Sequence, residues 1–374
     1  MDYFNAHRYG ELAVVWLRLL YMKFGYTRYE MSRFEEYGLY AENSAFLASG
    51  EILTFTGRGG KLMALRPDVT LSIIKHSRDG DGLQKLYYNE NVYRPAPGGL
   101  EFKERMQAGL ECIGDLDVYA MGEVIMLASM SLGLLGGRSC LDISHMGYIN
   151  GLLKSAELTQ SQRDELLRRV SEKNVPELSA LCVEYGLGVA FRDKITALAS
   201  LYGPIGESLE ELRRISAGDE CDAAIKELEE LLAVLRAFGV EENINIDFSI
   251  VNDMRYYSGV IFQGYIEGVP AKLLSGGRYD KLLRKFGYQK SGAIGFAVYI
   301  DLLEHVQPPH SEPEVDVLLI YGGDVTPEEV ARKVKDLSAD DKSVRVQRVD
   351  SSDTPSYIPH KLLVCMTKEE AGND

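Results

Sequence analysis

The sequence predicts an α+β protein in which strand-rich and helical segments are separated along 374 residues. Three observations support this prediction. Strand-like runs fill residues 51–114 and return at residues 244–266, whereas residues 151–240 hold charged helices with leucine at helical spacing. After the linker QPPHSEPE, a strand, a helix and further strands follow within residues 315–366. That order predicts a small α/β unit with a parallel pair of strands.

Composition argues against several classes of function. The formal net charge is −15 at pH 7, and a diffuse acidic surface repels phosphate backbones, so nucleic acid is disfavoured as the main partner. The five cysteines are scattered and form no CxxC pair. We therefore expect free thiols in a reducing compartment, with no disulfide framework, no metal site and no cofactor.

The sequence gives no sign of a membrane protein. Its first residues lack the ordered regions of a signal peptide. The longest apolar run, residues 124–137, is too short to span a bilayer and is typical of a core helix. We expect a soluble, cytoplasmic protein that does not contact a membrane.

Individual elements follow from the spacing of apolar residues. Residues 5–24 have helical spacing and end before a glycine, which predicts a helix. Residues 51–71 place two apolar runs around a GRGGK turn, which predicts a β-hairpin, since the turn lacks the spacing of a phosphate loop. Residues 83–94 and 106–114 predict two more strands. Residues 294–303 predict a strand that opens near a glycine and runs into an apolar helix.

Two segments place charged side chains where a ligand could be held. In LRPDVT, Arg66, Asp68 and Thr70 alternate, so on a strand all three face one side, with Asp68 able to accept from a ligand ammonium. The alternative is an ordinary half-exposed strand end. Arg94 ends its predicted strand and is placed to clamp a carboxylate or phosphate, although a surface ion pair is the alternative for this residue alone.

A third segment supplies a polar wall. Gln107, Gly109 and Glu111 alternate on one predicted strand, and the glycine lets a ligand or backbone approach closely. Burial of Glu111 without a cationic ligand or partner would be costly.

Three tyrosines are further candidates for the same cavity. Tyr256 and Tyr257 open YYSGVIF, and we expect one of them to face the cavity and the other to pack outside it. Tyr279 follows a glycine pair in GGRYD and is expected along the cavity floor. Aromatic core packing is the alternative for each.

Taken in order, these motifs resemble the core of class II histidyl-tRNA synthetases. The order is LRPDVT, YYNENVYR, ERMQAGLECIG, a helical insertion, NDMRYYSGVIF, GGRYD and IGFAVYIDLL. The resemblance covers about residues 1–310, with the insertion at about 151–240. It implies a six- or seven-stranded antiparallel sheet flanked by helices, working as a dimer. Residues 313–374 resemble a truncated anticodon-binding domain.

The resemblance also implies a histidine site. The positions that would surround bound histidine are Asp68, Thr70, Arg94, Gln107, Glu111, Tyr257 and Tyr279, with Tyr256 beside them. Charge matching then predicts the ammonium of histidine near Asp68 and Glu111 and its carboxylate near Arg94.

Three departures from the family pattern concern adenylation. Asn252 stands where the family has its catalytic arginine, Leu302 replaces the arginine that meets ATP, and Glu101 replaces a phosphate-binding arginine. One preorganised donor is commonly worth about 3 kcal/mol of transition-state stabilisation, so we expect negligible adenylation. Residues 313–374 carry 8 Lys and Arg against 13 Asp and Glu, and this negative charge disfavours binding of tRNA.

A histidine pocket without adenylation fits a sensor. Over its whole length the chain resembles the regulatory subunits of ATP phosphoribosyltransferase. That resemblance implies a non-catalytic protein that activates the short-form catalytic subunit and transmits feedback inhibition by L-histidine in histidine biosynthesis. Two alternatives stay open: an active histidyl-tRNA synthetase, and a synthetase-like paralogue with another ligand.

Overall fold

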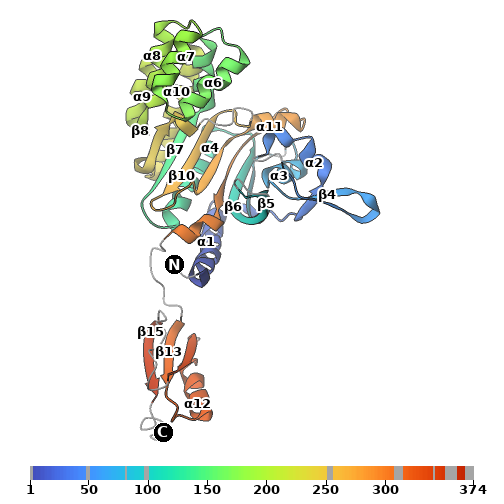
Figure 1. The fold of residues 1–374 in the computed structure, drawn as a ribbon, viewed down its shortest axis with the longest axis vertical. Helices are drawn as coiled ribbons and strands as arrows, with labels where there is room; N and C mark the ends of the chain where they lie inside the picture. The colour runs from blue at the N-terminus through green and yellow to red at the C-terminus, as the bar shows by residue number, and fades with distance from the viewer. Residues whose placement is uncertain are drawn as a thin grey trace. The chain divides into compact units, whose positions relative to one another are not determined.

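The computed structural model describes residues 3–47, 51–80, 82–96, 101–250, 256–306, 315–339, 342–349 and 360–366. The chain divides into two compact units, Met1–Gln307 and Pro308–Asp374 (Figure 1). The first unit contains the central sheet, the helical segment and the cavity described below. The second is a small α/β unit.

A nine-stranded sheet forms the centre of the first unit, in the order β1-β5-β6-β12-β11-β10-β7-β9-β8. The bounds, in that order, are Thr27–Arg28, Gln84–Pro95, Phe102–Gly114, Gly292–Tyr299, Leu274–Arg278, Val260–Ile266, Ser139–His145, Ile244–Asp247 and Tyr202–Pro204. The continuous antiparallel part runs from β5 to β7, and the pairs β1–β5 and β7–β9 are parallel. The predicted fold class is therefore confirmed, with additional short strands at both edges of the sheet.

Helices α1 (Tyr3–Lys23) and α4 (Val118–Leu134) pack on the sheet and on each other. Helix α4 is buried along most of its length, which confirms the predicted core helix. Asp117 caps its first turn by accepting from the backbone N–H of Ala120 at 2.7 Å. The Tyr21 hydroxyl lies 3.1 Å from Ser131 Oγ and joins the two helices inside the core.

A smaller sheet of order β2-β4-β3 contains the predicted hairpin and projects from the core (Figure 1). Its strands are Phe34–Glu36, Leu62–Leu65 and Thr54–Thr56, in that order. The short segments around it are α2 (Tyr37–Ala41), η1 (Ser44–Phe46) and η2 (Arg58–Gly60).

The prediction that LRPDVT lies on one strand is wrong. Strand β4 ends at Leu65, and helix α3 (Thr70–His76) begins at the last residue of the motif. Pro67 has no N–H to continue a ladder, and Asp68 Oδ1 accepts from the backbone N–H of Leu71 at 2.9 Å in the first turn of α3. The motif is therefore a strand-to-helix corner.

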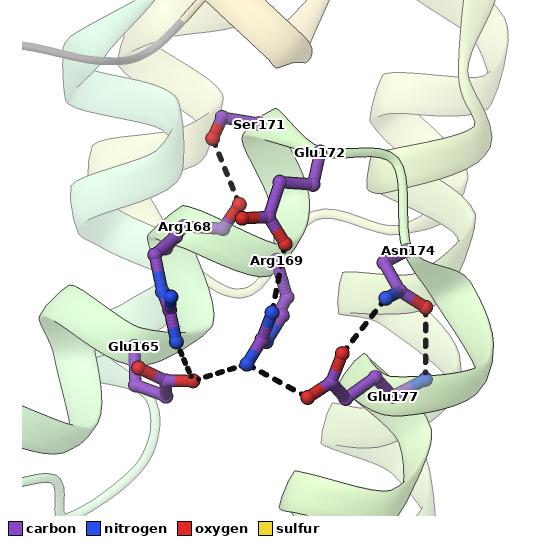
Figure 2. A network of polar contacts seen from close by, with 7 residues as sticks. All are labelled: Glu165, Arg168, Arg169, Ser171, Glu172, Asn174 and Glu177. Carbon is purple, nitrogen blue, oxygen red and sulfur yellow. Dashed lines mark hydrogen bonds and ion pairs between the residues drawn. The ribbon is translucent and has the colours of Figure 1, made fainter.

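Six helices lie between β7 and β9 in the chain. They are α5 (Met146–Lys154), α6 (Gln160–Ser171), α7 (Val175–Glu184), α8 (Val189–Ser200), α9 (Ile205–Arg214) and α10 (Asp219–Phe238). Figure 2 shows the polar network that joins α6 to α7, in which Arg169 contacts Glu165 and Glu172 at 2.8 Å and Glu177 at 2.7 Å. Asn174 also accepts from the backbone N–H of Glu177 at 3.3 Å, so the start of α7 is held by the same group of residues.

The remaining short elements of the first unit are η3 (Glu241–Asn243), η4 (Phe248–Ile250), α11 (Asp280–Lys285) and η5 (Ile300–His305). The predicted strand over residues 294–303 is β12 followed by η5, so its helical part is a 3₁₀ turn.

The second unit is a three-stranded parallel sheet with one helix among its described residues. Strands β13 (Val315–Tyr321), β14 (Val344–Arg348) and β15 (His360–Met366) form the order β14-β13-β15, and α12 spans Pro327–Leu337. Both strand pairs are parallel, as the sequence predicts. Within the described parts of both units, no helix has the length and apolar character needed to cross a membrane.

Candidate functional site: a polar cavity on the central sheet

A cavity of about 220 Å³ lies on the sheet face formed by β6, β12, β11 and β10. All eight residues predicted for the site line it: Asp68, Thr70, Arg94, Gln107, Glu111, Tyr256, Tyr257 and Tyr279. The structure thus brings together side chains from the corner before α3, from β5 and β6, and from segments more than 140 residues further along the chain.

The sheet register explains the cavity floor. Glu111 on β6 lies opposite Gly295 on β12, which in turn lies opposite Gly277 on β11. Gln107 and Gly109 lie on the same face of β6 as Glu111, as the alternation predicts. A Cβ at Gly109 would come within 2.2 Å of the Phe296 carbonyl oxygen, so this position allows a close backbone approach.

Glu111 is the buried acid of the cavity. It is 2% exposed, and its two carboxylate oxygens accept from Thr70 Oγ1 at 2.8 Å and from the Tyr279 hydroxyl at 2.5 Å. Burial raises the pKa of Glu111 to about 8, and the charge of Asp68 adds to that shift, while the two hydrogen bonds oppose it. Without a bound cation, this side chain is therefore largely protonated at neutral pH.

Gly295 makes room for that carboxyl group. A Cβ at this position would lie 1.8 Å from Glu111 Oε2, closer than any side chain permits. The glycine near the start of IGFAVYIDLL is thus required by the acid on the neighbouring strand.

Arg94 and Asp68 face each other at the cavity wall. Arg94 Nη2 lies 3.5 Å from Asp68 Oδ2, and Arg94 Nε donates to the Pro67 carbonyl oxygen at 2.7 Å. Both side chains are mostly buried. The other charged residue of LRPDVT, Arg66, is fully buried and pairs with Glu90 at 2.8 Å, and it is not among the residues that line the cavity.

The tyrosines form an aromatic wall. Tyr256 and Tyr257 both line the cavity, so the prediction that one of them packs outside is wrong. They precede β10, where strand alternation does not apply, and their ring centroids lie 4.7 Å apart at 68°. The ring of Tyr279 lies 5.7 Å from that of Tyr256. Burial raises the pKa of Tyr256 and of Tyr279 well above 10, so both hydroxyls stay protonated.

Sequence reasoning missed several lining residues. They include Phe46, Tyr88, Gln263, Lys272, Ser275 and Tyr299. The sheet register alone would have found some of them, because Tyr88 pairs with Gly109, Ser275 with Gln263, and Tyr299 with Gln107. Phe46 and Lys272 lie outside the strands, and no local pattern marks them.

Two of the three positions tied to adenylation are among the described residues, and neither lines the cavity. Glu101 is exposed and its carbonyl oxygen accepts from the backbone N–H of Ala96 at 2.8 Å. Leu302 lies in η5 and packs against the main hydrophobic core. Asn252 lies outside the described residues.

The cavity is equipped to bind a small molecule that carries both charges. It has acids at Glu111 and Asp68, cations at Arg94 and Lys272, and hydroxyls from serine, threonine and tyrosine. Within the described ranges, no group of three or more metal-ligating side chains is present.

Comparison with known proteins first defines the class. The family model for histidyl-tRNA synthetase matches residues 7–303. The antiparallel sheet and the cavity on it thus belong to a protein of the class II histidyl-tRNA synthetase type.

Individual relatives narrow the family. An ATP phosphoribosyltransferase regulatory subunit from Oceanobacillus iheyensis is 30% identical over 310 residues, which are 80% of this chain and 75% of that protein. The chain is also similar to a crystal structure from Bacillus halodurans C, which is described as an ATP phosphoribosyltransferase regulatory subunit/histidyl-tRNA synthetase. The two are 27% identical in sequence with a TM-score of 0.74, and the match covers 96% of this chain and 94% of that chain. The chain belongs to the family of ATP phosphoribosyltransferase regulatory subunits.

A third comparison concerns fold alone. The ATP phosphoribosyl transferase (HisG:HisZ) complex from Thermotoga maritima contains a chain that is 19% identical with a TM-score of 0.60. The match covers 77% of this chain and 96% of that chain.

Proposed function

We propose that this chain is a non-catalytic, cytoplasmic subunit that activates the short-form catalytic subunit of ATP phosphoribosyltransferase and senses histidine. The observation behind the proposal is the polar cavity, which gathers all eight predicted side chains around the buried acid Glu111. The names of the relatives support the regulatory role, and the Thermotoga maritima complex supports a catalytic partner.

In the proposed complex, the ammonium of histidine lies near Asp68 and Glu111, and its imidazole lies toward Tyr257 and Tyr279. A positive group beside Glu111 would favour the ionised carboxylate and offset the desolvation that raises its pKa. The carboxylate of histidine lies toward Arg94, whose charge is partly balanced by Asp68. Histidine then favours one arrangement of the assembly over another, which is a coupling free energy between two sites.

We also propose that the chain performs no adenylation and does not engage tRNA. Adenylation depends on cations placed around the phosphates of ATP. Among the described lining residues, only Arg94 and Lys272 are cationic, and Arg94 already faces Asp68. ATP–pyrophosphate exchange that depends on histidine would instead support an active synthetase.

A dimer is part of the proposal. One side of α1 packs on the core, but Val15, Leu19 and Met22 are 49%, 59% and 48% exposed at helical spacing. An apolar stripe on one helix favours burial by a second copy. We expect Leu19→Asp to shift the protein toward monomer in sedimentation velocity, whereas an unchanged dimer would place the contact elsewhere.

Calorimetric titration with histidine tests the site. Glu111→Ala removes the central acid and should weaken binding at least tenfold, since the charged ligand loses its partner. Glu104→Ala is the matched control, because Glu104 is an exposed acid on the same strand. Equal histidine affinities of Glu111→Ala and wild type would overturn the placement of histidine beside Glu111. A folded wild type that does not bind histidine would favour another ligand.

A further inference from the structure

We propose that Lys272 joins Arg94 in binding the carboxylate of the amino acid in this cavity and makes the site select ligands that carry a free carboxylate. The inference rests on the proposed histidine site and deepens it, because it names the residue that determines specificity at one end of the ligand.

Lys272 and Glu111 both line the cavity but come from different positions along the sheet. It comes two residues before β11, and the backbone N–H of Tyr299 donates to the carbonyl oxygen of the next residue, Leu273, at 2.8 Å. Tyr299 pairs with Gln107, four residues along β6 from Glu111. Four residues of a strand span about 13 Å, so the backbones of the acid and of this lysine lie apart along the sheet, and their long side chains extend into the same cavity.

The ammonium of Lys272 has no protein counter-ion within the described parts of the chain. The residue as a whole is exposed, yet its side chain lines the cavity, and partial burial there lowers the pKa of Lys272. Arg94 differs, because it faces Asp68 at 3.5 Å and donates to the Pro67 carbonyl oxygen. A cation that is partly desolvated without gaining a partner is destabilised, and an incoming carboxylate would offset that cost.

The neighbours of Lys272 fit a carboxylate as well. Ser275 and Gln263 pair across β11 and β10, and both line the cavity with Tyr299. Their hydroxyl and amide groups can donate to the oxygens that the ammonium does not reach. A charged donor with neutral donors beside it is a common carboxylate site.

The test compares histidine with histidinol, which has a hydroxymethyl group in place of the carboxylate. Lys272→Met keeps the apolar stem and should weaken histidine binding at least tenfold while changing histidinol binding less than twofold. Lys272→Arg should restore most of the affinity for histidine. Lys290→Met, which changes an exposed lysine outside the cavity, should match wild type.

Three results would overturn the inference, and they are separable from failure of the proposed function. Unchanged histidine affinity in Lys272→Met, or an equal loss for both ligands, would refute the role of Lys272 while leaving the histidine site in place. Failure of Lys272→Arg to restore binding would argue for a structural role. A wild type that binds no histidine would remove the proposed function itself, together with this inference.

Discussion

The buried acid Glu111 should make the stability of the protein fall as pH rises through the neutral range. Its carboxyl group is enclosed by Thr70, Tyr279 and the Gly295 backbone, and it retains its proton up to a pKa of about 8 in the folded chain. In the unfolded chain the same group titrates near its ordinary value of about 4.5. Between these values the folded state binds one more proton than the unfolded state.

The magnitude follows from proton linkage. The favourable contribution is fully present below pH 4.5 and is lost as pH rises toward 8, because the unfolded chain gains from ionisation and the folded chain does not. From pH 5 to pH 8 the loss amounts to roughly 3 kcal/mol. Glu111→Gln cannot titrate, so its free energy of unfolding should lack this slope and exceed that of wild type at pH 8.

Urea unfolding at half-unit steps from pH 5 to pH 8 measures the difference between Glu111→Gln and wild type. Subtraction cancels other acids whose pKa burial raises, such as Asp142. Glu104→Gln, an exposed control on the same strand, should keep the wild-type slope. Parallel curves for Glu111→Gln and wild type would refute a buried, protonated Glu111. With saturating histidine, the proposed ligand contact should flatten the wild-type curve.

Three further changes probe other contacts. Gly295→Ala places a Cβ 1.8 Å from Glu111 Oε2, so it should abolish histidine binding and lower the Tm. Calorimetry that shows wild-type affinity for histidine would contradict this steric explanation. Arg66→Met leaves the Glu90 carboxylate and two backbone carbonyl oxygens without their buried partner. It should lower the free energy of unfolding, measured in urea, by about 3–5 kcal/mol, and a decrease below about 1 kcal/mol would contradict this expectation. Arg169→Ala removes the centre of the partly buried network in Figure 2, so it should lower the Tm modestly in low salt and less in high salt. A loss of Tm that does not depend on salt would point to packing instead.

The sheet and one wall of the site follow from local sequence pattern. Alternation along β6 is a property of any strand with one covered face, so it correctly places Gln107, Gly109 and Glu111 on one side. The hairpin around the GRGGK turn and the apolar core helix α4 follow from equally local signals. These features are predictable because neighbouring residues determine them.

Other parts depend on contacts that the local pattern does not contain. In LRPDVT, the alternation of polar residues predicts a strand. In the structure, Pro67 interrupts the strand, and the hydrogen bond from Leu71 to Asp68 lies in the first turn of a helix. A Pro–Asp pair before an apolar run is also a sequence signal for the start of a helix. Asp68 and Thr70 still line the cavity, but from the corner between β4 and α3 rather than from a strand. Lys272 lies in the connection between β10 and β11, and only the assembled sheet shows that its side chain lines the same cavity as Glu111.

The most direct test mixes the full-length chain with a short-form ATP phosphoribosyltransferase catalytic subunit, ideally from the same organism. Condensation of ATP with phosphoribosyl pyrophosphate is followed with and without histidine. The account predicts activity that requires this chain and falls when histidine is added, with the histidine response lost in Glu111→Ala. A matched pair that forms no active complex, or activity indifferent to histidine, would contradict it.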